Sequence, residues 1–136
     1  MSQQNVEIVR EMFALVNEHG VKAATDAFGD LLDSDFELEE AANLPDQERH
    51  SGRDAFIANM AKLEESFEDL RFEPIEFVDL GSKLVVVVAI AGRGRAGGVP
   101  VDTTIAQLWT LRNGKAVSLR DYASKDDALE AAGLSE

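Results

Sequence analysis

The chain has no cysteine, only three prolines and one tryptophan, and no apolar run long enough to span a bilayer. Without cysteine, disulfide bonds, thiolate catalysis and thiolate metal sites are excluded. No segment near the N-terminus has the order of charged, apolar and small residues that is typical of a signal peptide. These absences predict a cytoplasmic protein without a membrane partner.

Basic residues are also scarce, because 13 Lys and Arg stand against 26 Asp and Glu, for a net charge of −13. Such a surface repels phosphate backbones, so we expect no nucleic-acid partner. Two separated histidines and no cysteine predict no metal site. The 136 residues, 45% of them hydrophobic, predict a single domain over 1–136 with a core of its own.

What the sequence does contain is a series of helical patterns followed by strands. Apolar residues at helical spacing predict a first helix that ends at Gly20, a second over Val21–Phe28, and a third that begins after Ser51. The alternating segment Asp35–Glu39 predicts a short strand, and the polar segment Ala42–Ser51 predicts a loop.

Long strands are predicted over Arg71–Leu80, Leu84–Ala91, Val101–Leu111 and Ala116–Ala123, before a closing helix at about Asp126–Ala132. The order α-α-β-α-β-β-β-β-α indicates an α+β fold in which a curved antiparallel sheet wraps round the N-terminal helices. The strand Leu84–Ala91 is apolar on both faces, so both faces must be covered by other parts of the structure. The helices would cover one face, and a second copy of the chain the other, which predicts a homodimer.

The dipeptide Asn113-Gly114 is typical of a two-residue hairpin turn, which sets the register of the last two strands. Counting outward from it places Ala106 opposite Asp121 and Leu108 opposite Leu119, so that Asp121 shares an apolar face with them. Desolvation there would raise the pKa of Asp121 and make it an acid/base candidate. Pairing with an arginine across the sheet, or exposure at the strand end, is the alternative.

Several segments together resemble the nuclear transport factor 2-like superfamily and, within it, SnoaL-like proteins. They are Ser51-Gly52-Arg53-Asp54-Ala55, Gly114-Lys115-Ala116-Val117, Arg120-Asp121-Tyr122 and the run Ala128–Leu134. The resemblance covers essentially the whole chain and implies a cone-shaped α+β barrel with a hydrophobic pocket at its wide end. It does not settle the activity, because the superfamily includes isomerases, cyclases, epoxide hydrolases, dehydratases and proteins without catalysis.

Resemblance to ketosteroid isomerases would place the general base at Glu39 or Glu40. The alternative for both residues is a carboxylate exposed to solvent. It would place the two oxyanion donors at Met12 and Ala106, whose side chains cannot donate a hydrogen bond. Limonene-epoxide-hydrolase-like proteins also need an arginine and an aspartate on an earlier strand, but Leu84–Ala91 has no ionisable residue. Both activities are therefore disfavoured.

The chain also resembles SnoaL-type polyketide cyclases. Their activity requires little beyond an aspartate on the last strand, here Asp121, and an apolar cavity, because their substrate stabilises its own enolate. It implies a cofactor-free, cyclase- or isomerase-type proton transfer on a small apolar substrate. The alternative is a non-catalytic module for small-ligand binding or dimerisation. The residues expected to line the pocket are Met12, Phe36, His50, Ala106, Leu108 and Leu119, with Glu39 or Glu40 at its mouth.

Overall fold

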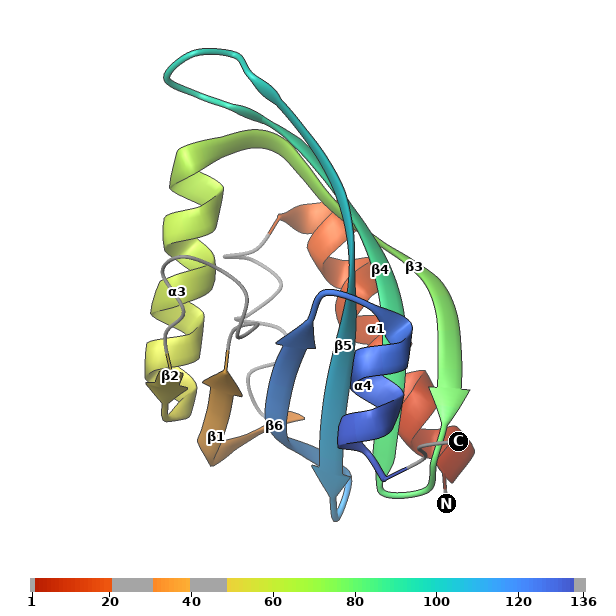
Figure 1. The fold of residues 1–136 in the computed structure, drawn as a ribbon. Coiled ribbons are helices and arrows are strands. Elements are labelled where there is room, and N and C mark those ends of the chain that lie inside the picture. The colour runs from red at the N-terminus through yellow and green to blue at the C-terminus, as the bar shows by residue number, and fades with distance from the viewer. Residues whose placement is uncertain (1, 21–30, 40–48, 134–136) are drawn as a thin grey trace.

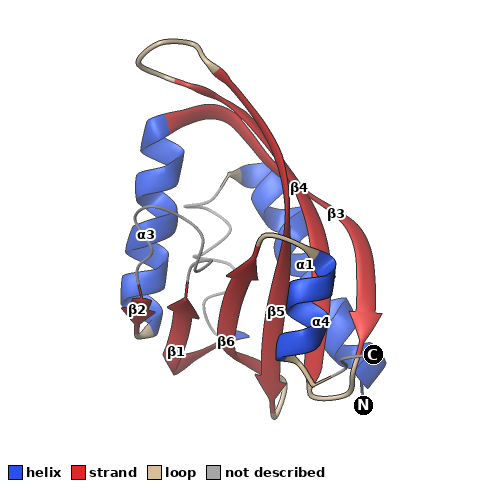
Figure 2. Cartoon of the chain, in the orientation of Figure 1, coloured by secondary structure: helices blue, strands red, loops and turns tan. Residues whose placement is uncertain are grey.

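A computed structural model of the chain describes residues 2–20, 31–39 and 49–133. The expected α+β order is confirmed over these residues, while the predicted helix Val21–Phe28 lies outside them. One short strand is present where the sequence predicted the end of a loop. The elements, shown in Figures 1 and 2, are α1 (Ser2–His19), β1 (Leu32–Glu39), β2 (Arg49–Ser51), α3 (Arg53–Ser66), β3 (Phe67–Asp79), β4 (Lys83–Gly94), β5 (Pro100–Arg112), β6 (Lys115–Tyr122) and α4 (Lys125–Ala131).

The described strands form one curved sheet in the order β2-β1-β6-β5-β4-β3, with β2 and β3 at its edges. Neighbouring strands are antiparallel, with one exception: β1 runs parallel to β6. The helix α3 ends at Ser66 and β3 begins at the next residue, so the chain passes from helix to sheet without a loop. The curvature brings α3 to the concave side of the sheet (Figure 1).

The concave face of the sheet and the N-terminal helix bury the main core. The helix α1 packs along β3 and places the apolar stripe predicted from its sequence against the strands. Side chains at alternating positions of the strands complete this core, because every second residue of a strand faces the same side. Its buried members are Val9, Met12, Phe13, Val16, Leu32, Phe36, Phe56, Phe72, Leu84, Val86, Val88, Trp109, Leu111, Ala116 and Leu119.

A second, smaller core lies on the outer face of the sheet, under α4. There the helix buries Ala128 against Val85, Ala106 and Leu108. The side chain of Ser124 caps the helix by accepting a hydrogen bond from the backbone N–H of Asp127 at 3.2 Å. The chain therefore provides part of the outer layer itself, where the sequence predicted that only a second copy could do so.

The hairpin between β5 and β6 has the predicted turn but not the predicted register. Asn113 and Gly114 have φ values of 54° and 78°, as a type I′ turn requires. A β-bulge follows, because Leu111 pairs with Ala116 while Thr110 pairs with Ser118, which leaves Val117 as an extra residue in β6.

This bulge corrects the expected facing of the two strands, because a slip of one residue exchanges the faces of a strand. Asp121 lies opposite Gln107, and Leu119 lies opposite Trp109. Ala106 instead pairs with Tyr122 and faces outward. The prediction that Ala106 and Leu108 share a face with Asp121 was wrong, and Gln107 and Trp109 share that face instead.

The side chain of Asn17 holds α1 to the edge strand β3. Its Nδ2 donates to the carbonyl oxygen of Phe72 at 2.8 Å, and its Oδ1 accepts from the Phe72 N–H at 3.0 Å. These are backbone groups that an edge strand leaves without a partner strand. The amide therefore satisfies two partly buried backbone groups at once and fixes the position of the Phe72 side chain.

We expect Asn17→Ala to lower the free energy of unfolding by about 1–3 kcal/mol, because two partly buried backbone groups lose their partner. Urea denaturation followed by circular dichroism measures this change. The variant Glu11→Ala, at an exposed position of the same helix, is the matched control. A urea midpoint for Asn17→Ala equal to that of the control would show that water satisfies the Phe72 backbone equally well.

Candidate functional site

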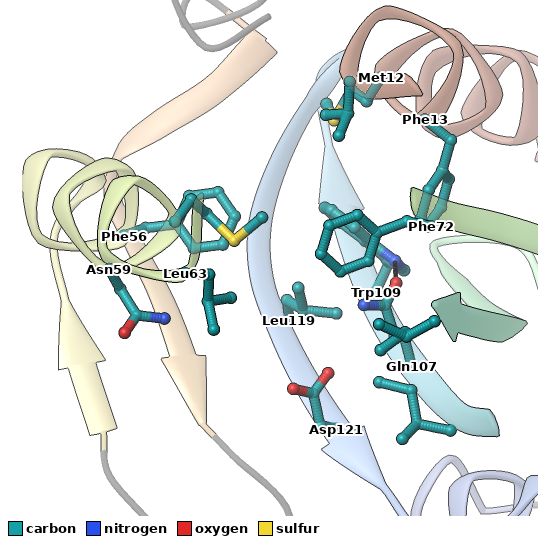
Figure 3. A pocket seen from close by; sticks show the side chains of 14 residues that line it. Met12, Phe13, Phe56, Asn59, Leu63, Phe72, Gln107, Trp109, Leu119 and Asp121 are labelled. Atoms are coloured by element: carbon teal, nitrogen blue, oxygen red, sulfur yellow. Dashed lines mark hydrogen bonds between the residues drawn. The ribbon is translucent and has the colours of Figure 1, made fainter. Parts of the chain in front are cut away.

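A cavity of about 130 Å³ lies between α1, α3 and the concave face of the sheet. It is close to the size of an engineered protein cavity that binds benzene. Its walls are mostly aliphatic and aromatic, which suits a small apolar molecule. The 14 lining side chains drawn in Figure 3 are Met12, Phe13, Val16, Phe56, Asn59, Met60, Leu63, Phe72, Ile90, Ile105, Gln107, Trp109, Leu119 and Asp121.

The polar groups of the cavity gather at one end. Asn59 of α3 lies across from Asp121 of β6, and Gln107 of β5 lies beside it (Figure 3). Asn59 and Asp121 are half-buried, so the cavity approaches the surface at this end, whereas Gln107 is only 7% exposed. A ligand in the cavity would therefore meet an apolar body and one polar end.

Asp121 is the ionisable side chain among the described lining residues. It stands near the end of β6, two residues after Leu119, and both side chains point into the cavity (Figure 3). Its Oδ1 atom is buried within the protein. A carboxylate oxygen inside a mostly apolar cavity is where proton-transfer chemistry is commonly found. The sequence predicted this residue, and its catalytic role stays a prediction.

A hydrogen-bonded pair, Trp109 and Gln107, forms the wall next to Asp121. The indole Nε1–H of Trp109 donates to Oε1 of Gln107 at 3.0 Å, and both side chains are buried. Two residues apart on β5, they share the concave face. Sequence reasoning missed this pair because it depends on the bulge at Val117, which no turn or periodicity signal announces.

The other residues predicted for the pocket have separate places. Met12 and Leu119 lie in its wall. Phe36 is buried behind the wall, with its ring centroid 4.8 Å from that of Phe56 and 6.3 Å from that of Trp109. The prediction that Ala106 and Leu108 line the pocket was wrong, because both face α4 on the outer side of the sheet.

The remaining predicted residues are His50, expected in the pocket lining, and Glu39 or Glu40, expected at its mouth. Glu39 is the last residue of β1, where its backbone is in register with Arg120 of β6. His50 is the central residue of β2 and is in register with Leu38. Glu40 lies outside the described residues. The role of these three at the pocket stays a prediction.

Over residues 2–20, 31–39 and 49–133, no group of three His, Asp or Glu side chains is placed to hold a metal ion. None of the described helices is long and apolar enough to cross a membrane.

Fold and cavity together define the class of protein, in which a curved sheet and its helices enclose a small, mostly apolar pocket. The described lining of this pocket includes the carboxylate of Asp121. Residues 9–119, which make up most of the chain, match the SnoaL-like domain family. The chain therefore belongs to the SnoaL-like domain family, and the resemblance noted in its sequence is confirmed. No curated protein matches its sequence.

Solved structures share the fold over nearly the full length. A nuclear transport factor 2-like protein from Burkholderia xenovorans LB400 is 28% identical, with 100% of this chain and 98% of that one covered and a TM-score of 0.73. A candidate SnoaL-like polyketide cyclase from Jannaschia sp. CCS1 is 22% identical, with 99% and 94% covered and a TM-score of 0.76.

A third similar structure is a protein with a ketosteroid isomerase-like fold from Catenulispora acidiphila DSM 44928, in complex with trimethylamine. It is 20% identical, with 94% of this chain and 93% of that one covered and a TM-score of 0.72. At this level of identity the likeness shows the fold alone.

Proposed function

We propose that this protein binds a small, largely apolar molecule in the cavity and that Asp121 transfers a proton on it. The observation that carries the proposal is one carboxylate, with a buried oxygen, in the wall of a cavity lined by aliphatic and aromatic side chains. Apolar walls supply binding through the hydrophobic effect, and the carboxylate supplies the chemistry.

The proposed reaction is a proton transfer at a carbon next to an electron-withdrawing group of the substrate. Asp121 takes a proton from that carbon, and the electron pair is delocalised over the substrate's own conjugated system. The resulting carboxylic acid then returns the proton to the same or another carbon of that system, so the carboxylate is regenerated. Because Asp121 both takes and returns the proton, this chemistry requires no cofactor.

The family supports this kind of chemistry, and the position of Asp121 agrees with it. SnoaL-type cyclases resemble this chain in the last strand, and the Jannaschia protein carries the name of such a cyclase. The Catenulispora protein, in its complex with trimethylamine, has a small molecule bound to the same fold. The substrate proposed here is accordingly small and hydrophobic, and a cytoplasmic location stays a prediction from the sequence.

A second candidate function is non-catalytic binding of a small ligand in the same cavity. The observation that favours it is the absence of arginine, lysine and histidine from the described lining residues. These described lining residues therefore bring no positively charged side chain to a developing oxyanion. The two functions share the pocket and differ in whether Asp121 exchanges protons with the ligand.

We expect the protein to catalyse hydrogen–deuterium exchange at the α-carbons of 2-indanone in D₂O, a ketone whose enolate is conjugated with its ring. Asp121→Asn should reduce the rate at least about 100-fold, because a general base contributes roughly 10²–10⁴-fold. Proton NMR of the ketone measures the rate. The circular dichroism spectrum should match that of the wild type, because asparagine has nearly the same shape as aspartate.

The control for this experiment is Asp102→Asn, the same change at an exposed position of β5. It should exchange 2-indanone at the wild-type rate. Equal exchange rates for the wild type and a folded Asp121→Asn variant would refute the proposed role of Asp121. Binding of 2-indanone without any catalysed exchange would favour the non-catalytic function.

We also propose a homodimer formed through the outer face of the sheet. The helix α4 covers Val85 on this face, but Val87 and Ala89 farther along β4 remain half-buried and Ala91 is exposed. This apolar row lies on β4, between the edge strand β3 and β5. A second copy packed across it would remove it from water.

We expect sedimentation at micromolar concentration to give twice the mass of one chain. Ala89→Glu should shift the protein to the monomer, because a two-fold interface would bring both new carboxylates together in a buried place. Ala14→Glu, at an exposed position of α1, should leave the mass unchanged. A wild-type protein with the mass of a single chain would exclude this dimer.

A further inference from the structure

The hydrogen bond between Trp109 and Gln107 fixes which way the Gln107 amide faces. An indole N–H can only donate, so the group that meets it must be the amide oxygen. The donor–acceptor distance of 3.0 Å in a buried position is that of a well-formed bond. The NH₂ group of Gln107 must therefore point away from Trp109.

The direction left to this NH₂ group is toward the polar end of the cavity. Gln107 lines the cavity and lies directly opposite Asp121 in the register of β5 and β6. Residues directly opposite each other on one face have their Cβ atoms about 5 Å apart. Among the described residues, Trp109 is the hydrogen-bond partner of the Gln107 side chain. The two N–H donors of this group thus face the cavity, where a ligand atom could accept a hydrogen bond from them.

We propose that the Gln107 NH₂ group binds a carbonyl oxygen of the ligand, so that the pocket selects small apolar ketones over hydrocarbons of the same shape. This inference rests on the proposed small-molecule pocket but not on catalysis by Asp121. The Trp109 indole acts as a positioning group, since it holds the amide with its donors toward the ligand. The inference depends on the observed register, which places Gln107 opposite Asp121. In the register expected from the sequence Ala106 would stand there, and its side chain cannot donate a hydrogen bond.

The arrangement also defines where a bound ketone places its acidic hydrogens. With the carbonyl oxygen on Gln107, one α-carbon of the ketone lies on the side of Asp121, its cross-strand neighbour. When the carboxylate takes the α-proton, the C–H electron pair forms the enolate C=C bond and the carbonyl π pair moves onto oxygen. The Gln107 NH₂ group stabilises the negative charge at that oxygen. On return of the proton to carbon the carbonyl forms again.

The test compares 2-indanone with indane, which differ by one carbonyl in place of one methylene. Trp109 is the single tryptophan of the chain and lines the cavity, so its fluorescence reports binding of either compound. Hydrophobicity alone favours indane, because the ketone must lose its hydrogen bonds to water. We expect the wild type to overcome this difference and bind 2-indanone at least as tightly as indane.

Gln107→Met keeps a similar side-chain length and removes both donors. The ratio of the indane Kd to the 2-indanone Kd should fall by about 10-fold or more, because the ketone loses its hydrogen bond in a buried site. Indane should bind with an affinity equal to the wild type or higher. Gln4→Met, the same change at an exposed position of α1, should leave the ratio unchanged.

A second variant and a second signal test the positioning role of Trp109. Trp109→Phe keeps the Gln107 amide but frees it to rotate, so the same ratio, measured by calorimetry, should fall several-fold. In ¹⁵N NMR of the wild type, the side-chain NH₂ signal of Gln107 should shift with 2-indanone far more than with indane. A group that only packs the wall would shift equally with both.

Three outcomes would overturn the inference. They are an unchanged affinity ratio in folded Gln107→Met, equal shifts of the Gln107 NH₂ signal with both compounds, and no binding of 2-indanone up to its solubility limit. The fate of the proposed catalysis can be read separately. Selective binding of 2-indanone without deuterium exchange would support the role of Gln107 and refute proton transfer by Asp121. Deuterium exchange together with an unchanged affinity ratio in Gln107→Met would support proton transfer and refute the role of Gln107.

Discussion

The β-bulge at Val117 is the constraint on which the rest of the site depends. One extra residue in β6 exchanges the faces of the strand between the hairpin turn and its C-terminal half. Ala116, before the bulge, and Leu119, after it, can therefore both face the concave core although they are three residues apart. The same shift aligns Asp121 with Gln107 and brings an acceptor and a donor side by side in the cavity.

The two layers of helices follow from the same division of faces. The concave face carries large apolar side chains and is covered by α1 and α3, which leave a cavity at one end. The outer face carries Val85, Ala106 and Leu108, and the buried alanine of α4, Ala128, packs against them. The strand β4 is apolar on both faces, and near α4 the chain itself covers its outer face.

Sequence reasoning recovers what depends on local periodicity and turn chemistry. The described helices α1, α3 and α4, the long strands and the Asn113-Gly114 turn follow from apolar spacing and from the φ values that the turn requires. The bulge could not be predicted in this way, because Val117 is β-branched and suits a regular strand as well as a bulged one. That single extra residue is why Ala106 and Leu108, which were expected beside Asp121, lie on the opposite face of the sheet.

The polar end of the cavity is where local rules of burial are broken, and such places are commonly functional. A core made only for stability would carry apolar side chains where Gln107 and Asp121 stand, since burying polar groups costs free energy unless each finds a partner. Trp109 satisfies one end of Gln107 and leaves the other directed into the cavity. A bound carbonyl would accept a hydrogen bond from that amide, so the ligand itself would take part in the hydrogen bonding at the polar end of the cavity.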